Sequence, residues 1–437
     1  MTPQERTRAL LEDAARRAIA HIESLPERRV APSADAVARL ASLYEPVPDG
    51  PAAPGEILHT LDSVVAPATM AMPGGRFFGF VIGGALPVTV AANWIAGAWD
   101  QNAGYYTPTP GVATLEDVAL LWLLELLDLP RDGAGAFVTG ATTANFSALA
   151  AARHHVLARA GWNVEADGLA GAPPITVLAG DEVHPSVLKA LGMLGLGRKR
   201  VLRVPVDGQG RMRADALPAI SGPTIVCVQA GNVNTGAFGL WAAAAPSLRH
   251  LAAGLNEADS WATDFHKWLN VPYDSGLAVV RHGSALSAAM AVTAEYLPGA
   301  SPVRHPSDFT PELSRRARGV EVWAALKSLG RSGLAEMIER NCRQARRLAE
   351  GLRAAGYDVL NDVVLNQVLV AFGDADATSR VIAAIQADGT CWCGGTVWQG
   401  RTAMRISVSS WATTDDDVEQ SLAAILRCAS FGPSRSR

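Results

Sequence analysis

A lysine among apolar residues is the strongest sign of chemistry in this sequence. Lys267 lies in residues 264–268 (DFHKW), directly after the strand-like residues 260–263 (SWAT). Trp261, Trp268 and Leu269 flank it, and apolar surroundings disfavour a charged ammonium. A neutral lysine amine is a nucleophile for carbonyl carbon, so an aldehyde cofactor is the expected electrophile. From Lys267 alone, the favoured alternative is a lysine whose stem emerges from a buried strand end.

Two further segments place polar groups where a ligand could bind. Residues 139–145 (TGATTAN) follow a predicted strand and open a predicted helix, so backbone N–H groups and hydroxyls could hold a phosphate. Ordinary N-capping by Thr142 or Thr143 is the alternative. His184 follows another strand and opens another helix, which places it at the carboxyl edge of a parallel sheet, where ligands bind in open α/β folds. A lone histidine is usually structural, but this one shares its edge with the phosphate-type loop.

The elements that must position these residues form an α/β pattern. From about Leu120, short β-branched runs alternate with helical segments, which indicates a mainly parallel sheet covered on both faces. After about Pro311 the sequence predicts helices at 314–329 and 334–354, then short strands and a last helix opened by Asp415, Asp416 and Asp417. We therefore predict an N-terminal helical segment (1–75), a large α/β domain (76–310) and a small C-terminal α+β domain (311–437).

The composition excludes several classes of protein. The 437 residues carry 38 Lys+Arg and 42 Asp+Glu, and 49% are hydrophobic, which is enough for sizeable buried cores. The small net negative charge and the lack of a long basic run argue against a nucleic-acid partner and an anionic membrane surface. Gly, Pro and Asn interrupt the two uncharged stretches, 77–99 and 216–248, so neither is predicted to span a membrane. Five cysteines without paired ligand spacing fit reduced cytoplasmic thiols and predict no metal site.

Four motifs in order resemble one enzyme family. They are residues 140–145, 184–187, 229–232 and 264–268, and the likeness extends from residues 76–79 through 314–316 to 404–407. Together they resemble the group II decarboxylases that use pyridoxal phosphate, which include aromatic amino acid and glutamate decarboxylases. The resemblance implies the aspartate-aminotransferase-like fold (fold type I), pyridoxal 5'-phosphate as cofactor, an amino acid substrate, and a homodimer with active sites at its interface.

The resemblance also assigns roles. Lys267 matches the lysine that forms the internal aldimine with the cofactor, and His184 matches the histidine that stacks on the pyridine ring. Ala141 and Thr142 match the phosphate loop, with His266 and Asp264 beside the phosphate and Asn232 near the ring substituents. Arg405 matches an arginine that holds a substrate carboxylate in some relatives, a role that its planar fork suits. A surface salt bridge is the alternative for Arg405.

The sequence departs from this family at one place. Relatives carry an aspartate that pairs with the pyridine nitrogen, at the end of a strand between the Asn232 loop and the lysine strand. Here no Asp or Glu occurs between Asp215 and Glu257, and two Gly-Ala-Phe segments of relatives are fused into residues 236–238. We predict an internal deletion of about one helix plus strand after Phe238. For comparison, a complete βαβ unit takes roughly 30 residues. The strands beside the gap should then lack hydrogen-bonding partners.

These observations predict a cytoplasmic carboxy-lyase that removes the α-carboxyl group of an L-amino acid. Phe77, Phe78, Phe80 and Trp94 favour an aromatic or apolar substrate, although packing explains them equally well. One alternative is a catalytically impaired or inactive homologue, because the ring-nitrogen carboxylate is missing; Asp259, Asp264 and Asp274 could replace it only after rearrangement. Another alternative is an aldehyde synthase or other lyase, since Phe309 stands near the place of a catalytic tyrosine in aromatic decarboxylases.

Overall fold

The computed structural model describes residues 1–237, 239–292 and 303–430, and it divides into two compact units. Unit 1 contains both ends of the chain: Met1–Ile82, Arg347–Val359 and Val370–Arg437. Unit 2 contains Gly83–Arg346 and Leu360–Leu369. Each unit is described by itself below.

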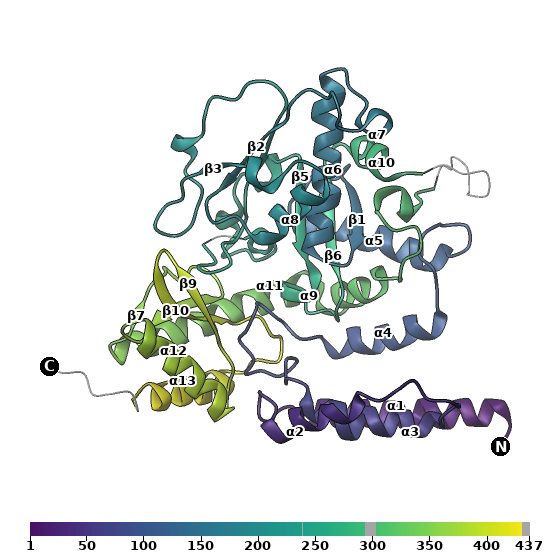
Figure 1. Ribbon diagram of the computed structural model, residues 1–437, viewed down its shortest axis with the longest axis vertical. Helices are drawn as coiled ribbons and strands as arrows, with labels where there is room; N and C mark the ends of the chain where they lie inside the picture. The colour runs from purple at the N-terminus through teal and green to yellow at the C-terminus, as the bar shows by residue number, and fades with distance from the viewer. Residues whose placement is uncertain (238, 293–302, 431–437) are drawn as a thin grey trace. The chain divides into compact units, whose positions relative to one another are not determined.

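Unit 2 holds the helices and strands that carry most of the predicted site residues (Figure 1). Its helices are α4 (Pro87–Trp99), α5 (Pro110–Leu126), α6 (Ala141–Arg159), α7 (Val164–Asp167), α8 (Pro185–Met193), α9 (Phe265–Trp268) and α10 (Gly283–Met290). Its strands are β1 (Ala134–Val138), β2 (Thr176–Gly180), β3 (Leu202–Val204), β4 (Thr224–Cys227), β5 (Ser260–Asp264) and β6 (Gly276–Val280). Helix α11 (Gly319–Ala354) begins in unit 2 and breaks at Gly330, which has φ 59°, so the two helices predicted here form one element with a kink.

The strands of unit 2 form two separate three-stranded sheets. One has the order β3-β2-β4, with both neighbours parallel to β2. The other has the order β1-β6-β5, in which β6 is antiparallel to both neighbours, so that β1 and β5 run in the same direction. The α/β class is confirmed, but the central sheet is interrupted between β4 and β5. The two flanking strands thus each have one neighbour, as the predicted deletion requires.

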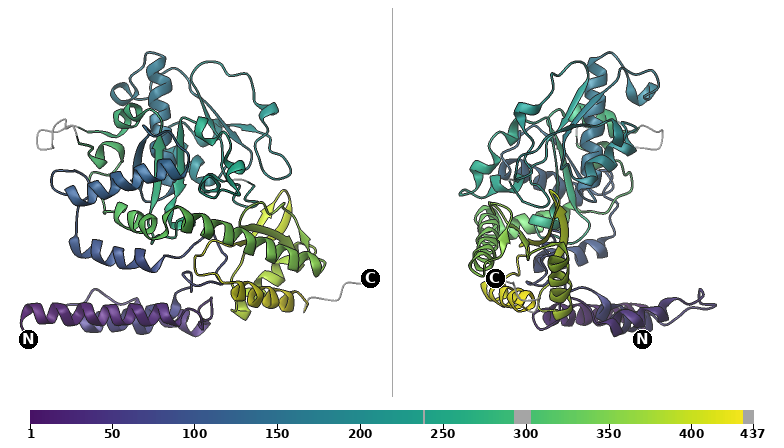
Figure 2. Two further views of the ribbon diagram at one scale, coloured as in Figure 1. Left: turned by 180° about the vertical axis from the view of Figure 1, so that it is seen from behind. Right: turned by 60° about the vertical axis from the view of Figure 1, so that its left-hand side comes forward.

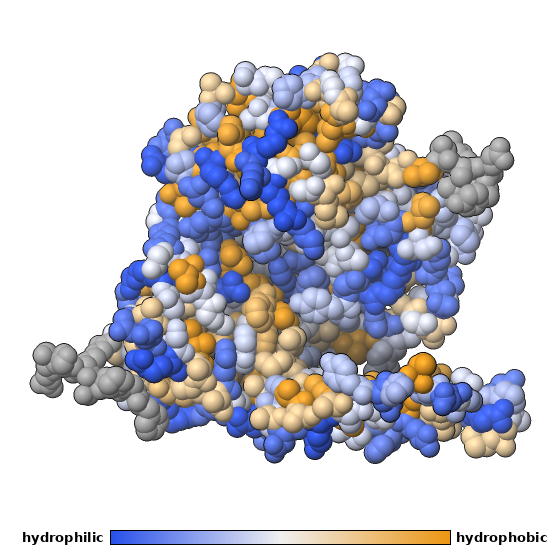
Figure 3. Space-filling model, viewed as in Figure 1, coloured by the Kyte–Doolittle hydropathy of each residue, from blue (hydrophilic) through white to orange (hydrophobic). Residues whose placement is uncertain are grey.

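The segment that joins β4 to β5 contains little regular structure. Apart from Phe238, which lies outside the described residues, residues 228–259 contain three short 3₁₀ turns at Leu240–Ala244, Arg249–Ala252 and Leu255–Glu257. Val226 in β4 is 38% exposed and Val228 is 58% exposed, although a strand inside a covered parallel sheet is normally buried on both faces. Apolar residues are also visible at the surface over β2 and β3 (Figure 3). This edge of the sheet therefore lacks part of its expected cover.

One hydrophobic core nevertheless supports both sheets. Helix α6 packs against β1, β5 and β6 of one sheet and against β4 of the other. The shared cluster includes Val138 from β1, Val177 from β2, Ile225 from β4 and Ala278 from β6. Behind this core, α4, α5 and the start of α11 meet through a smaller cluster of Ala96, Ala103, Val112, Ala317 and Val320 (Figure 2). The helices thus hold both sheets even though the strands do not form a continuous ladder.

Unit 1 consists of N-terminal helices and a C-terminal α+β part. Its helices are α1 (Pro3–Ser24), α2 (Ala34–Arg39), α3 (Pro54–Thr60), α12 (Ala375–Asp388) and α13 (Asp415–Ser430). A four-stranded sheet has the order β7-β8-β10-β9, formed by β7 (Asp358–Val359), β8 (Gln367–Ala371), β10 (Arg401–Ser407) and β9 (Gly394–Trp398). The first three residues of β8, 367–369, count with unit 2. Helix α13 begins at Asp415, where the three predicted aspartates face the positive end of its dipole.

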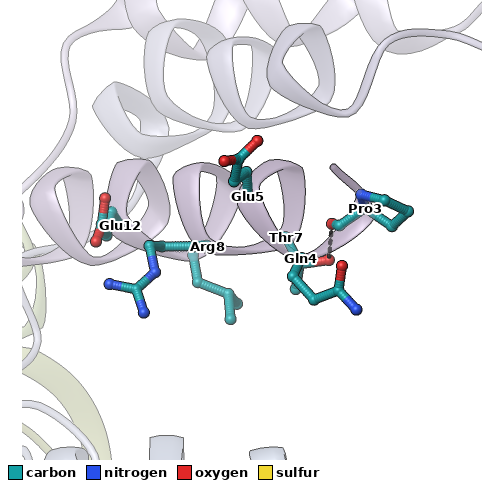
Figure 4. A pocket seen from close by; sticks show the side chains of 7 residues that line it. Pro3, Gln4, Glu5, Thr7, Arg8 and Glu12 are labelled. Atoms are coloured by element: carbon teal, nitrogen blue, oxygen red, sulfur yellow. Dashed lines mark hydrogen bonds between the residues drawn. The ribbon is translucent and has the colours of Figure 1, made fainter. Parts of the chain in front are cut away.

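The first turns of α1 form a shallow surface hollow. Its lining residues all come from this helix and are Pro3, Gln4, Glu5, Thr7, Arg8, Leu11 and Glu12 (Figure 4). The Thr7 hydroxyl donates to the Pro3 carbonyl, and Thr2 and Glu5 form a capping box. None of the predicted site residues lines this hollow. Among the described residues, no helix is long and apolar enough to cross a membrane.

Candidate active site

Lys267 lies where β5 ends and the short helix α9 begins. Its Nζ atom is 2.6 Å from Oδ2 of Asp264, the last residue of β5. The Lys267 side chain is 30% exposed, whereas that of Asp264 is 8% exposed. The expectation of purely apolar surroundings is therefore wrong for the amine itself, because a buried carboxylate contacts it.

Asp264 also reaches the predicted phosphate loop. Its Oδ1 atom accepts a hydrogen bond of 2.5 Å from the backbone N–H of Ala141, the first residue of α6. Burial raises the pKa of the Asp264 carboxyl. The charge and hydrogen bond of Lys267, together with His266 and the Ala141 N–H, lower this pKa by more than burial raises it, so it lies below its usual value. Asp264 is thus an anion at the N-terminus of a helix, where the helix dipole favours negative charge.

The loop before α6 approaches the lysine strand very closely. Gly276 begins β6 and pairs with Val138 on one side and with Asp264 on the other. A Cβ atom at Gly276 would lie 2.5 Å from the Cα atom of Gly140. A Cβ atom at Gly140 would lie 3.1 Å from Oδ1 of Asp264. Glycine at both positions therefore allows the α6 N-terminus to meet the end of β5.

His266 is held between the lysine turn and the start of β6. Its Nδ1 atom accepts a hydrogen bond of 3.2 Å from the Ser275 N–H, and its Nε2 atom is 3.5 Å from Oδ1 of Asp264. Its ring stacks on Tyr273 with centroids 4.2 Å apart. Burial lowers the pKa of His266 more than the charge of Asp264 raises it. The imidazole is therefore neutral at pH 7, with a fixed orientation.

Sequence reasoning missed the contribution of Tyr273 and Ser275. Burial raises the pKa of Tyr273 to about 12, and the charge of Asp264 adds to this effect. Tyr273 is therefore a neutral phenol, and its ring stacks on that of His266. The only signal in the sequence was an aromatic residue six positions after Lys267, in residues 267–273 (KWLNVPY), and this spacing alone specifies no contact.

His184 lies on the other sheet, at the N-terminus of α8. Its backbone N–H donates to Oε1 of Gln229 at 2.7 Å, and its Nδ1 atom is 2.8 Å from Oγ of Ser186. The same Ser186 oxygen accepts a hydrogen bond of 3.1 Å from Asn145 of α6. This relay connects His184 to the helix whose first residue contacts Asp264. Thr142, the second residue of α6, lies beside that contact in the chain.

Asn232 is buried in a turn on the same side as His184. Its Nδ2 donates to Oε2 of Glu182 at 2.6 Å, while its Oδ1 accepts from the backbone N–H groups of Asn234 and Thr235. Gly236 closes the turn with φ 59° and a hydrogen bond to the Asn232 carbonyl. These contacts connect Asn232 to the segment just before His184.

Arg405 belongs to unit 1, whereas Lys267 belongs to unit 2. It lies in β10 opposite Gly394 of β9, and burial lowers the pKa of its guanidinium. Its assignment to a substrate carboxylate therefore stays a prediction.

The other carboxylates proposed as substitutes have separate surroundings. Oδ1 of Asp274 accepts a hydrogen bond of 3.0 Å from Nε of Arg318, and Asp259 is exposed before β5. The Cζ atom of the Arg304 guanidinium lies 4.9 Å from the ring centroid of Phe309, and Phe309 packs against the shared core. Among the described residues, no cluster of three or more His, Cys, Asp or Glu side chains is placed to hold a metal ion.

The residues present fit two parts of pyridoxal phosphate. Lys267 supplies a partly exposed amine, and the α6 N-terminus already accommodates an anion, the carboxylate of Asp264. The part that would face the ring nitrogen differs, because residues 216–256 contain no carboxylate and the described residues between β4 and β5 form no strand. The structure therefore fits the aldehyde and phosphate ends of the cofactor better than its ring nitrogen.

Comparisons with known proteins identify the family. A sequence model described as "Pyridoxal-dependent decarboxylase conserved domain" matches residues 40–242 and 236–373. The two matching segments overlap at 236–242, which is where the sequence predicts the deletion. An aromatic-L-amino-acid decarboxylase of Bacillus atrophaeus is 26% identical over 386 residues, covering 80% of this chain and 78% of that protein. Tryptophan decarboxylase 1 of Oryza sativa subsp. japonica is 26% identical over 417 residues, covering 81% and 80%.

Solved structures share the fold. A crystal structure of Oryza sativa TDC with PLP and tryptamine has a TM-score of 0.89 at 21% identity and covers 98% of this chain and 99% of that chain. Rhodiola rosea 4-hydroxyphenylacetaldehyde synthase has a TM-score of 0.85 at 17% identity, with 99% and 100% covered. The family match spans more than half of the sequence. This chain therefore belongs to the pyridoxal-dependent decarboxylase family of carboxy-lyases, and its cofactor is pyridoxal 5'-phosphate.

Proposed function

We propose that this chain binds pyridoxal phosphate at Lys267 and decarboxylates an aromatic L-amino acid slowly, because it lacks the carboxylate that faces the ring nitrogen in relatives. The observation that carries the proposal is the interrupted sheet between β4 and β5, in a stretch without Asp or Glu. When bound, the cofactor supplies an electron sink for the bond pair released from the substrate carboxylate. The substrate class follows the names of relatives that are 26% identical.

The residues on the lysine side have the following proposed roles. Lys267 presents its neutral amine to the cofactor aldehyde as the nucleophile, with Asp264 2.6 Å away. Ala141 and Thr142 offer N–H groups to the phosphate at the start of α6, and neutral His266 lies beside the phosphate. On the other sheet, His184 covers the ring and Asn232 lies near its substituents. Arg405 would hold the substrate carboxylate.

The decisive experiment repairs the sheet. One variant receives, between Phe238 and Gly239, the helix-and-strand segment of a decarboxylase relative, which carries the aspartate and ends in Asp-Gly-Ala-Phe. A matched variant receives the same segment with asparagine at that position. Carbon dioxide release is measured for all three proteins with aromatic and acidic amino acids. We expect the aspartate insertion to raise kcat by about a hundredfold or more, the usual order for one electrostatic group in an active site.

The two insertions separate repair of the sheet from restoration of charge. Equal gains from the aspartate and asparagine insertions would show that the strand matters and its charge does not. Robust turnover of the unmodified chain, equal to that of the aspartate insertion, would refute slow catalysis. If borohydride reduction in the presence of pyridoxal phosphate leaves Lys267 unmodified while the protein is folded, the assignment of Lys267 is wrong.

A second candidate is an aldehyde synthase. Phe309, near the place where aromatic decarboxylases carry a tyrosine, contacts Arg304 and the core. The product distinguishes the two reactions, since a decarboxylase releases an amine and an aldehyde synthase releases an aldehyde. A Phe309→Tyr variant should shift the product toward amine if this position decides the outcome.

We further propose a cytoplasmic homodimer. Helix α1 contributes no buried side chain, and its apolar Leu11, Ile19 and Ile22 are exposed, which leaves an amphipathic surface for a second copy. Light scattering after size-exclusion chromatography measures the mass directly, and a mass of one chain would refute the dimer.

A further inference from the structure

One carboxylate connects three groups that the proposed function assigns to the cofactor. Asp264 lies 2.6 Å from the Lys267 amine through Oδ2 and 2.5 Å from the Ala141 N–H through Oδ1, and Oδ1 is also 3.5 Å from Nε2 of His266. The side chain is 8% exposed. Asp264 therefore contacts the amine that must react and the groups that would hold a phosphate.

The physical consequence is competition between two anions. A helix N-terminus favours negative charge, and at Ala141 the carboxylate already uses the first backbone N–H of α6. A phosphate monoester brings close to two further negative charges, which repel a carboxylate within a few ångströms. The same carboxylate contacts the Lys267 amine at 2.6 Å, so a ligand that displaces Asp264 also frees the amine.

We propose that Asp264 is a built-in anion that occupies the α6 N-terminus and holds the Lys267 amine until a phosphate-bearing ligand displaces it. This proposal rests on the proposed function, since it concerns the same site. Asp264 is then a positioning residue. It weakens phosphate binding, and in the cofactor-free protein it fixes the Lys267 amine and the Ala141 N–H through its two contacts. A purely structural role, in which Asp264 only fixes the lysine turn, predicts the opposite effect of its replacement.

The test compares Asp264→Asn, Asp264→Ala and the control Asp259→Asn. Asparagine keeps an oxygen that can accept the Ala141 hydrogen bond but removes the charge. Asp259 precedes the other end of β5, roughly 16 Å away along the strand, so its replacement removes the same charge from outside the site. The probe is inorganic phosphate, titrated into cofactor-free protein and followed by calorimetry, with circular dichroism and a thermal melt to verify folding.

We expect Asp264→Asn to bind inorganic phosphate at least about tenfold more tightly than the wild type, which corresponds to about 1.4 kcal/mol. Asp259→Asn should match the wild type. Asp264→Ala, if it folds, should gain at least as much affinity, because it also frees the Ala141 N–H for the phosphate. Pyridoxal phosphate should modify Lys267 faster in Asp264→Asn, as measured by borohydride trapping and mass spectrometry.

Unchanged or weaker phosphate binding by folded Asp264→Asn overturns the proposal, and so does an equal gain in Asp259→Asn. Failure of the proposed function is seen separately, as wild-type protein in which pyridoxal phosphate never modifies Lys267. The phosphate titration still decides the role of Asp264 in that case, because it involves neither the aldehyde nor catalysis.

Discussion

The contact between Gly276 and Gly140 makes a sharp prediction about the substitution Gly276→Ala. The added methyl carbon would lie 2.5 Å from the Cα atom of Gly140, 2.8 Å from its carbonyl carbon and 3.0 Å from its nitrogen. All three are backbone atoms, so no side chain can rotate away. Gly276 also sits in the central strand of its sheet, between Val138 and Asp264, which leaves it little freedom to shift.

The size of the effect follows from this geometry. An ordinary carbon–carbon contact is about 3.5 Å or more, so the two backbones must separate by about 1 Å. Overpacking of this kind costs about 1–3 kcal/mol of folding free energy. The same displacement moves the α6 N-terminus away from Asp264 and Lys267, and a misplacement of about 1 Å can cost a hundredfold in activity. We therefore expect both lower stability and weaker cofactor binding.

Urea denaturation measures the first effect, and titration with pyridoxal phosphate followed by the absorbance of the Lys267 adduct measures the second. The control is Gly97→Ala on the exposed face of α4, where a Cβ atom would meet nothing within 4 Å. It should be neutral or stabilising by up to about 1 kcal/mol, because alanine favours a helix. If Gly276→Ala matches the wild type in stability and cofactor affinity, the close approach does not shape the site.

Two other groups in unit 2 give independent predictions. The guanidinium of Arg315 is fully buried, 2.8 Å from the buried carboxylate of Glu116, so Arg315→Ala should lower the free energy of unfolding by about 3–5 kcal/mol in urea denaturation. Arg331→Ala removes an exposed pair with Glu125 and should cost less than about 1 kcal/mol; equal losses would contradict this reasoning. Burial lowers the pKa of His266, so the folded protein binds this proton less readily than the unfolded chain. Stability should therefore fall as pH drops below about 6.5 toward the lowered folded pKa, and His266→Gln should flatten that decline in denaturation series; parallel profiles would exclude His266 as its source.

The fold and the lysine side of the site could be predicted from sequence because each depends on local patterns. Strands followed by helices placed residues 139–145 and His184 at the carboxyl ends of β1 and β2, where the structure has them. The uncharged stretch 216–248, together with the missing carboxylate, located the interruption between β4 and β5. Length and charge patterns carry this information because a missing strand removes residues as well as a function.

Other properties of the site depend on contacts between segments that are distant in the sequence. The apolar flanks of Lys267 suggested a dry amine, but the side chain three positions earlier turns back to contact it. Tyr273 stacks on His266 because the chain reverses direction between α9 and β6, a turn whose geometry no residue type specifies. Arg405 lies in the other unit, and its relation to Lys267 is not encoded in the spacing of 138 positions between them.

The interrupted sheet divides the proposed site between two separate supports. Lys267, Asp264 and Ala141 all follow strands of the β1-β6-β5 sheet, whereas His184 and Asn232 follow strands of the β3-β2-β4 sheet. A continuous sheet would fix these two groups through a ladder of backbone hydrogen bonds. Here the described contacts between them run through α6, by its packing on both sheets and by the hydrogen bond from Asn145 to Ser186. Side-chain packing tolerates small displacements that a hydrogen-bonded ladder does not, and catalysis is sensitive to such displacements. We therefore expect the lack of a strand in the described residues between β4 and β5 to weaken the proposed site twice, once by removing a charge and once by loosening the geometry between His184 and Lys267. Comparing the insertion with asparagine and the insertion with aspartate separates these two effects.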